Sequence, residues 1–271
     1  MDYQGVQKHI VSWLSNYAKD TGVNGFVVGI SGGIDSALTS TLCALTGLKT
    51  VLVEMPIHQA ADQVSRGKEH IDFLTGKYEN CSSMVMDLTP TYDNFLSQLS
   101  EKAKVNKSEE IKNLTLGNTR ARLRMTTLYA VAGIEGLLVA GTGNKVEDFG
   151  VGFYTKYGDG GVDISPIADL YKTQVYALAK VLGVNQNILQ APPTDGLWDD
   201  GRTDEDQIGA SYAELEMAME LQAKYGNDVP FSAFNNEREQ QVWGIYLGRW
   251  KANQHKMNPI PVCEIPKELK A

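Results

Sequence analysis

The stretch Phe26-Val27-Val28-Gly29-Ile30-Ser31-Gly32-Gly33-Ile34-Asp35-Ser36 decides the fold class of this chain. Its first five residues form a short apolar run, which is typical of a strand buried in a parallel sheet. The glycines that follow let the backbone turn tightly and approach a ligand without a Cβ in the way. A helix is predicted directly afterwards, from Ala37 to Ala44. This order of strand, glycine turn and helix predicts the first unit of an α/β sheet.

The same alternation continues along the chain. Further strands are predicted at 50–55, 84–88 and 137–140. Apolar residues at helical spacing predict helices at 6–17, 59–74, 118–134 and 235–253, and a tail with three prolines after them is expected to be extended. We therefore expect one α/β domain over residues 1–271, with a doubly wound, mostly parallel sheet and helices on both faces.

Composition narrows the classes of function. Hydrophobic residues make up 42% of the chain and charged residues 21%, and the formal net charge is −8. A nucleic-acid binder usually has a basic face, so the charge argues against that class. The sequence contains no run of about 18 apolar residues and no signal peptide, so no membrane span is expected. The three cysteines form no CxxC pair and are interpreted as free thiols of a cytoplasmic protein.

The glycine loop predicts a phosphate site. The N-terminus of the following helix supplies free N–H groups and the positive end of a dipole, and Ser31 and Ser36 can donate hydroxyl hydrogen bonds. Asp35 would repel phosphates unless it holds Mg²⁺. No lysine follows the glycines as in the Walker pattern, so transfer of a γ-phosphoryl group is not indicated. A Gly-Gly pair can also be only a tight turn, but the complete hexapeptide after the first strand favours a phosphate site.

Polar residues after the fourth predicted strand extend this site. Gly141-Thr142-Gly143-Asn144-Lys145-Val146-Glu147 leaves that strand, and ligands of open α/β sheets bind beyond the carboxyl ends of strands. Glu147 is therefore a candidate second Mg²⁺ ligand. Three arginines, Arg120, Arg122 and Arg124, lie on the helix predicted before this strand. The segments 101–112 and 195–206 are either solvated connections or an active-site lid.

The hexapeptide Ser31 to Ser36 resembles the signature of the N-type ATP pyrophosphatases. Within that group, the series from about Gly22 to Lys256 closely resembles the NAD synthetase family, above all in Phe153-Tyr154-Thr155-Lys156-Tyr157-Gly158-Asp159-Gly160-Gly161. The resemblance implies a Rossmann-like, adenine nucleotide alpha hydrolase-like fold and a ligase that forms a C–N bond. In that family, ATP and Mg²⁺ activate the nicotinate carboxylate of deamido-NAD as an adenylate, pyrophosphate leaves, and ammonia displaces AMP to give NAD.

The resemblance also implies roles for individual residues. Catalytic roles would fall to Asp159, as the group that attracts ammonium and takes its proton, with Lys156 and Asp35, and Mg²⁺ would be held by Asp35 and Glu147. The residues expected to bind ATP are Gly29, Ile30, Ser31, Gly32, Gly33, Ile34, Asp35, Ser36, Thr142, Lys172 and Thr194. Those expected to bind deamido-NAD are Arg122 or Arg124, Lys156, Asp163, His255 and Lys256.

One position departs from the family pattern. Several members end the second strand with an arginine that helps to hold ATP, whereas this chain has Glu54 there. That contact must therefore be absent or replaced. No further length or reactive N-terminal Cys indicates a fused glutaminase domain, so ammonia is the expected nitrogen source. A homodimer is expected, with Trp13, Tyr17 and Tyr129 as candidate interface residues, and His9, His58 and His70 are interpreted as surface residues.

Two alternative functions remain open from the residues. A tRNA-thiolating pyrophosphatase would need a reactive cysteine or a basic RNA-binding face, and both the spacing of Cys43 and Cys81 and the net charge argue against it. A non-catalytic nucleotide-binding sensor could retain the same glycine loop. Release of AMP together with NAD would distinguish the synthetase from both.

Overall fold

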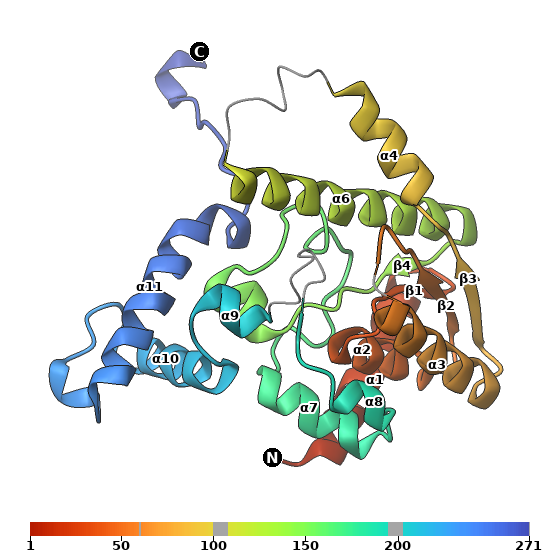
Figure 1. Cartoon of the computed structure of the whole chain (residues 1–271), viewed down its shortest axis with the longest axis horizontal. Coiled ribbons are helices and arrows are strands. Elements are labelled where there is room, and N and C mark those ends of the chain that lie inside the picture. Colours follow the sequence, from red (N-terminus) through yellow and green to blue (C-terminus); the bar gives the residue numbers. More distant parts are fainter. Residues whose placement is uncertain (60, 100–107, 195–202, 271) are drawn as a thin grey trace.

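The centre of the molecule is a parallel sheet, as predicted. The computed structural model of the chain describes residues 1–59, 61–99, 108–194 and 203–270. Four strands, β1 (Gly25–Ile30), β2 (Lys49–Glu54), β3 (Cys81–Val85) and β4 (Leu138–Val139), pair in the order β3-β2-β1-β4 (Figure 1). All three pairings are parallel. A single bridge from Ala140 to Ile164 adds a further chain segment beside β4.

Helices surround this sheet and connect its strands. The bounds are α1 (Tyr3–Thr21), α2 (Ile34–Ala44), α3 (Ala61–Lys77), α4 (Thr89–Gln98), α6 (Glu109–Glu135), η1 (Val146–Val151), α7 (Lys172–Val181), α8 (Gln186–Leu189), α9 (Asp204–Ile208), α10 (Tyr212–Tyr225), η2 (Phe231–Ala233), α11 (Glu237–Met257) and η3 (Lys267–Leu269). No described helix is long and apolar enough to cross a membrane. All three cysteines are free thiols.

Alternate residues of the central strands supply two separate cores. Phe26, Val28 and Leu52 point to one face, where they pack with buried residues of α1, α2 and α7. Val27 and Val51 point to the other face and pack against α4 and α6. Figure 1 shows α6 crossing one side of the sheet while α1, α2 and α7 lie on the other. Because side chains alternate across a strand, burial on both faces explains the uninterrupted apolar run that begins at Phe26.

A third core lies away from the sheet. Buried residues of η1, α9, α10 and α11 pack together there, with Tyr246 of α11 and Leu215 of α10 fully buried. Helices α9, α10 and α11 therefore form a group beside the sheet (Figure 1). This group supports the segment after β4, because η1 follows that strand and packs within the same core.

The third strand and the helix before the fourth strand differ from their predicted bounds. The third strand spans Cys81–Val85 rather than 84–88 because it is a half-exposed edge strand without a clear apolar run, while Leu88 is buried at the entry to α4. Helix α6 begins at Glu109, capped by the side chain of Ser108, well before the predicted start at Asn118. The end of the segment 101–112 is thus helical. Thr203 caps α9 at the end of 195–206. Residues 100–107 and 195–202, where the lid alternative rests, lie outside the described residues.

The interpretation of His70 as a surface residue was wrong. His70 is fully buried under α2, where its Nε2 lies 2.9 Å from the hydroxyl oxygen of Ser40. Helix α3 carries His70 inward because Ile71 and Leu74 next to it belong to the core. Burial lowers the pKa of His70 from 6.5 to about 4, because the charged imidazolium loses its water.

This buried histidine predicts a pH-dependent stability. The unfolded chain binds a proton at His70 below pH 6.5, whereas the folded chain resists it down to about pH 4. The contribution is therefore present above pH 6.5 and is lost as the pH falls. Between pH 7 and 5 the free energy of unfolding should fall by about 2 kcal/mol from this group. His70→Gln, which can still bond Ser40, should show a shallower pH dependence in urea titrations than wild type. His9→Gln, at an exposed position, is the control, and equal slopes for His70→Gln and wild type would contradict the assignment.

Candidate active site

Two loops meet at the carboxyl edge of the sheet. One leaves β1 at Ser31 and leads into α2, and the other leaves β4 and leads through Gly141 into η1. β1 and β4 are neighbours, but the chain goes from β1 to β2 on the opposite side. This is a topological switch point, where open α/β sheets leave a crevice for ligands. The residues expected to bind phosphate and metal therefore lie at the same place.

Glycines shape the loop between β1 and α2. Gly32 has φ of 80°, and a Cβ there would lie 2.4 Å from the carbonyl oxygen of Gln63 on α3. Gly33 is the N-cap of α2 and offers no side-chain cap to the first N–H groups of the helix. The hydroxyl of Ser36 donates to the carbonyl of Gly33 at 3.0 Å, and Ser31 Oγ accepts the N–H of Gly33 at 3.2 Å. The loop is thus tied in place while the start of the helix stays available to an anion.

A buried lysine joins the two loops. Lys172, the first residue of α7, places its Nζ 2.6 Å from Asp35 Oδ2 and 3.0 Å from Glu147 Oε1. Its side chain is 4% exposed. Burial alone would lower the pKa of Lys172, but the two carboxylates raise it above its ordinary value, so the amine stays protonated. The structure therefore brings together three residues, Asp35, Glu147 and Lys172, that the sequence analysis placed in one site.

Asn144 and Tyr212 orient these carboxylates. The buried side chain of Asn144 donates to Asp35 Oδ1 at 3.1 Å and accepts the N–H groups of Val146 and Glu147. Tyr212, from α10, places its hydroxyl 2.6 Å from Glu147 Oε1, and burial strongly raises its pKa, so it remains a donor. Sequence reasoning missed both roles. Asn144 directly before a helix was a visible signal, but nothing in the spacing pointed to Tyr212.

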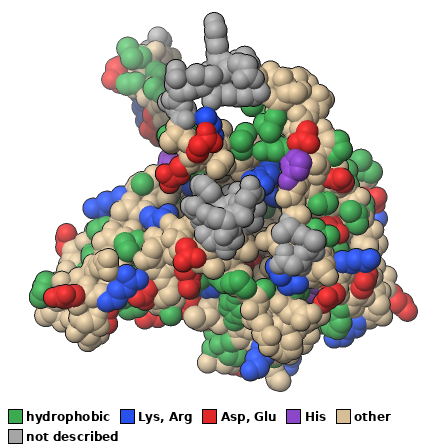
Figure 2. Space-filling view, viewed as in Figure 1, with side chains coloured by type: hydrophobic (Ala, Val, Ile, Leu, Met, Phe, Trp, Pro, Cys, Tyr) green, Lys and Arg blue, Asp and Glu red, His purple; other side chains and the backbone are tan. Residues whose placement is uncertain are grey.

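A large cavity opens above this cluster. It has a volume of about 760 Å³, within the usual range of ligand sites. Among its lining residues are the whole loop Gly29–Ser36, Thr142, Glu147, Lys172 and Thr194, and also Arg124, Asp159 and Lys256. Acidic and basic side chains are interspersed on the face drawn in Figure 2, rather than gathered into one basic field. Most of the expected site residues therefore surround one space.

Four expected residues are not among those that line this cavity. Arg122 donates to the carbonyl of Lys156, and the Lys156 ammonium bonds the carbonyl of His255. His255 is exposed, and its Nδ1 lies 3.1 Å from the carbonyl of Ala252. Asp163 accepts the N–H of Val139 at 2.8 Å and the hydroxyl of Tyr129 at 3.0 Å. In this structure, Lys156 ties the segment after β4 to the end of α11, and Arg122 and Asp163 tie that segment to α6 and β4.

Arg124 and Lys256 line the cavity and also bond its walls. Arg124 donates from Nε to the carbonyl of Met55, beyond the end of β2. Burial and the nearby Arg120 lower its pKa to about 10, so it stays charged at neutral pH. Lys256, near the end of α11, donates to the carbonyls of Gly152 and Tyr154 at 2.7 and 2.8 Å. Of the two arginines considered for the dinucleotide, Arg124 is the one at the cavity.

The end of β2 carries the departure noted in the sequence. Glu54 is 7% exposed, and burial raises its pKa. A carboxyl group cannot supply the positive charge that an arginine would bring to this position. Arg66, from α3, lines the cavity close to the glycine loop. Arg66 was not among the expected site residues. The residue spacing of its helix does not indicate which other element the helix packs against. A positive charge is thus present near the loop, but it comes from a different element.

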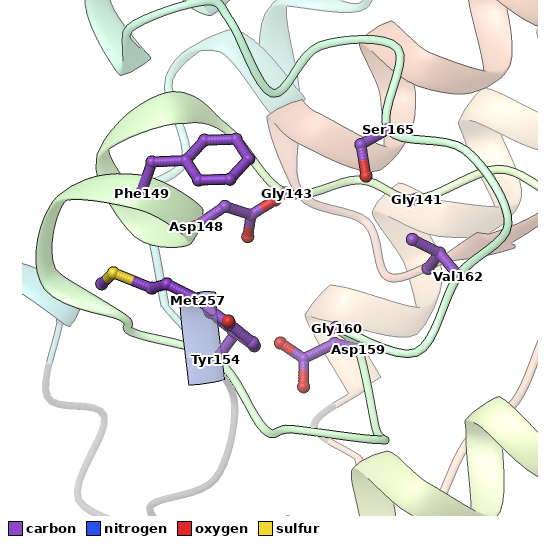
Figure 3. A pocket seen from close by; sticks show the side chains of 10 residues that line it. All are labelled: Gly141, Gly143, Asp148, Phe149, Tyr154, Asp159, Gly160, Val162, Ser165 and Met257. Atoms are coloured by element: carbon purple, nitrogen blue, oxygen red, sulfur yellow. The ribbon is translucent and has the colours of Figure 1, made fainter. Parts of the chain in front are cut away.

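Asp159 lies in the polar loop before Asp163 and faces a smaller cavity of about 140 Å³ (Figure 3). Its Oδ1 accepts the N–H of Thr155 at 3.0 Å, and burial raises its pKa. Asp148, directly after Glu147, faces the same cavity. Burial raises the pKa of Asp148 to about 8, and the charges of Glu147 and Asp159 add to the effect. Asp148 was not among the expected site residues.

The residues at the sheet edge fit a magnesium ion bound together with phosphates. Asp35 and Glu147 both lie within 3.0 Å of one nitrogen atom, so a single small cation can reach both. No group of three or more His, Cys, Asp or Glu side chains with metal-binding geometry occurs among the described residues. The chain would supply two ligands, and phosphate and water oxygens the rest, as is usual for Mg²⁺.

Comparisons with known proteins identify the family. The family model for NAD synthase matches residues 6–259. An NH(3)-dependent NAD(+) synthetase of Methanosarcina mazei is 39% identical over 269 residues, which cover 98% of this chain and 100% of the relative.

Two solved structures share the fold over nearly their whole length. The structure of NMN synthetase from Francisella tularensis has a TM-score of 0.80 and 30% identity, covering 98% of this chain and 99% of that chain. The NH3-dependent NAD synthetase from Campylobacter jejuni, in complex with the nitrate ion, has a TM-score of 0.75 and 26% identity, covering 97% and 100%. With the glycine loop, the carboxylate pair and the match over residues 6–259, this chain belongs to the NAD synthase family.

Proposed function

We propose that this chain uses ATP to amidate the nicotinate carboxylate of deamido-NAD with ammonia, releasing AMP, pyrophosphate and NAD. The carboxylate oxygen attacks the α-phosphorus and pyrophosphate leaves, which converts a poor electrophile into a reactive acyl adenylate. Ammonia then adds to the activated carbonyl, AMP leaves with the bonding electron pair, and one proton of the nitrogen is released. The protein mainly positions ligands and compensates charge.

The observation that carries this proposal is the meeting of Asp35 and Glu147 at one buried ammonium, beside a glycine loop with an uncapped helix start. Carboxylates beside a phosphate site make chemical sense only with a cation between them and the anion. The site combines an anion-binding backbone with the means to hold that cation.

The residues of the glycine loop, 29–36, would bind the phosphates of ATP, with Thr142 and Thr194 at the same cavity. Lys172 would move from the carboxylates to a phosphate oxygen when the nucleotide arrives, acting as a point charge. Asp35 and Glu147 would then hold Mg²⁺, which neutralises charge on the phosphates when bound. The negative charge of the two carboxylates would thus be balanced by the lysine in the free protein and by Mg²⁺ in the ATP complex.

The nicotinate half would lie toward Asp159. Arg124 and Lys256 line the cavity and would hold the dinucleotide. Lys156, Arg122 and Asp163 would act from behind this wall, by keeping the segment after β4 in place, and His255 would contribute through its carbonyl, which accepts the bond from Lys156. Asp159 would orient ammonium and take its proton, because its carboxyl group lines the cavity and burial raises its pKa, which makes it a stronger proton acceptor than an ordinary aspartate.

A second candidate substrate is the mononucleotide. The similar structure from Francisella tularensis is an NMN synthetase. Amidation of nicotinate mononucleotide uses the same carboxylate chemistry and the same ATP site but lacks the adenylate half of the dinucleotide. Discrimination between the two substrates would therefore depend on the outer part of the cavity, which would bind the adenylate half, and not on the chemistry at Asp159.

A homodimer is also proposed. Trp13 and Tyr17 of α1 are each more than a third exposed, and their rings are in tilted contact with centroids 5.5 Å apart. Tyr129 and Ile134 expose apolar surface on α6. Aromatic side chains of this kind are enriched in subunit interfaces.

The function is tested by an assay of products. The chain is incubated with Mg²⁺, ATP and ammonium, and with either deamido-NAD or nicotinate mononucleotide. We expect AMP and NAD in equal amounts with deamido-NAD and much slower turnover of the mononucleotide. Faster turnover of the mononucleotide would favour the second candidate. ATP binding without AMP formation in either mixture would exclude both and support a sensor.

Replacing the buried lysine tests the exchange of cations. Lys172→Met leaves two buried carboxylates without compensation, which should lower the stability of the free protein by about 3–5 kcal/mol. Mg²⁺ alone should raise the Tm of this variant by more than that of wild type, because the lysine no longer occupies the site. Lys145→Met, whose ammonium pairs with the exposed Asp169 at 2.8 Å, is the control and should change stability by less than about 1 kcal/mol. If Mg²⁺ shifts the Tm of Lys172→Met and wild type alike, the shared site is wrong.

Replacing Asp159 tests the amidation step. Asp159→Asn should reduce NAD formation by about 100-fold or more, since general base catalysis contributes on that scale. Exchange of labelled pyrophosphate into ATP, in the presence of deamido-NAD without ammonia, should persist because adenylation precedes the step. Asp169→Asn, which is exposed and not among the residues that line the cavity, should retain both activities. Loss of the exchange reaction in Asp159→Asn would place the residue in the adenylation site instead.

A further inference from the structure

The two carboxylate oxygens of Glu147 have different surroundings. Its Oε1 accepts two hydrogen bonds, from the Lys172 ammonium at 3.0 Å and from the Tyr212 hydroxyl at 2.6 Å. Within the part of the chain that the structure describes, no group donates to its Oε2. That oxygen is not sealed from solvent, and the Glu147 side chain lines the large cavity. The carboxylate is therefore held by one oxygen while the other is available to a ligand of the cavity.

The two donors to Oε1 differ in how firmly they are held. Lys172 reaches Glu147 through a flexible four-carbon stem, and under the proposed function its ammonium would leave for a phosphate oxygen. The ring of Tyr212 is only 5% exposed and packs in the core that η1, α9, α10 and α11 share. Once the lysine has left, the hydroxyl of Tyr212 is the remaining bond to the Glu147 carboxylate.

The backbone that carries this ring is fixed as well. Tyr212 is the first residue of α10, and its N–H donates to the Glu205 carboxylate of α9 at 2.9 Å. A capping box that includes Glu214 closes the first turn of α10. Glu214 also accepts two hydrogen bonds from Arg238 of α11, at 2.7 and 2.9 Å. Three helices therefore determine where the hydroxyl lies.

A second carboxylate lies near the same hydroxyl. Asp204, the first residue of α9, is 6% exposed and places its Oδ2 3.2 Å from the hydroxyl oxygen of Tyr212. A phenol has one proton to donate, and the shorter contact of 2.6 Å assigns that proton to Glu147. Departure of the lysine would leave more negative charge on Glu147 Oε1, which strengthens a hydrogen bond to it. The hydroxyl should therefore stay on Glu147 while the neighbouring cation changes.

We propose that Tyr212 is a positioning residue that sets the Mg²⁺ affinity of the site, by holding Glu147 Oε1 while the cation beside it changes from Lys172 to Mg²⁺. This inference rests on the proposed function, from which the exchange of cations is taken. Tyr212 is not among the residues that line the cavity, so it acts through Glu147. Hydrogen bonds that orient a metal ligand commonly contribute about 10–100-fold to metal affinity.

The test is Tyr212→Phe, which removes the hydroxyl and keeps the buried ring, whose centroid lies 4.8 Å from the Lys172 ammonium. The Mg²⁺ concentration for half-maximal NAD formation should rise by about tenfold or more. The kcat at saturating Mg²⁺ should stay within about threefold of wild type, and the KM for deamido-NAD should not change. An equal Mg²⁺ requirement in Tyr212→Phe and wild type would overturn the proposal.

The matched control is Tyr246→Phe. Tyr246 is a fully buried tyrosine of the same core, and its hydroxyl bonds Gln222, which does not line the cavity. This variant loses the same atom from the same core, but not the bond to Glu147. Its Mg²⁺ requirement should equal that of wild type, and a tenfold rise in both variants would assign the effect to the core instead.

A binding measurement separates this inference from the proposed reaction. Thermal unfolding is followed at increasing Mg²⁺ with α,β-methylene-ATP, which cannot be cleaved between its α- and β-phosphates. The Mg²⁺ concentration that gives half of the rise in Tm should be about tenfold higher for Tyr212→Phe than for wild type and Tyr246→Phe. This result without NAD formation by wild type would contradict the proposed reaction and still support the role of Tyr212. A lower Tm without Mg²⁺ but an unchanged half-maximal concentration would show a purely structural role. That result, or no response of wild type to Mg²⁺, overturns the proposal.

Discussion

The contact between Lys172 and the carboxylates of Asp35 and Glu147 is the interaction on which the site depends. Three charged groups are buried at the end of a sheet, where removal from water is costly unless each has a partner. One carboxylate comes from the loop after β1 and the other from the segment after β4, so their shared ammonium ties the two sides of the switch point together. The same contact keeps both carboxylates in position for a divalent cation.

The rest of the architecture can be understood as support for that contact. Gly32 lets the loop pass close to α3, and Asn144 bonds Asp35 while it accepts N–H groups at the start of η1. Tyr212 approaches Glu147 from the separate core of α9, α10 and α11. That core therefore also positions a hydrogen-bond donor for a carboxylate at the sheet edge. The chain belongs to the NAD synthase family, a family of ligases.

Two neighbouring residues of the segment after β4, Glu147 and Asp148, face different surroundings. Glu147 bonds Lys172 beside the phosphate loop, while Asp148 faces the small cavity that Asp159 also lines. The two adjacent carboxyl groups thus have different surroundings, because Glu147 lies beside an ammonium whereas burial and neighbouring acidic groups raise the pKa of Asp148 to about 8.

The residues alone determined the parallel sheet, its order of strand, glycine turn and helix, and the family, because uninterrupted apolar runs and a dense local motif are properties of neighbouring residues. They also indicated Asp35, Glu147 and Lys172, since all three follow or begin predicted elements. Only the tertiary structure decided that His70 is buried, that the third strand ends at Val85, that Asp163 bonds Val139 and Tyr129, and that Tyr212 and Asp148 face the site. Those facts depend on which distant segments pack together, and sequence periodicity reports the buried face of an element without naming what covers it.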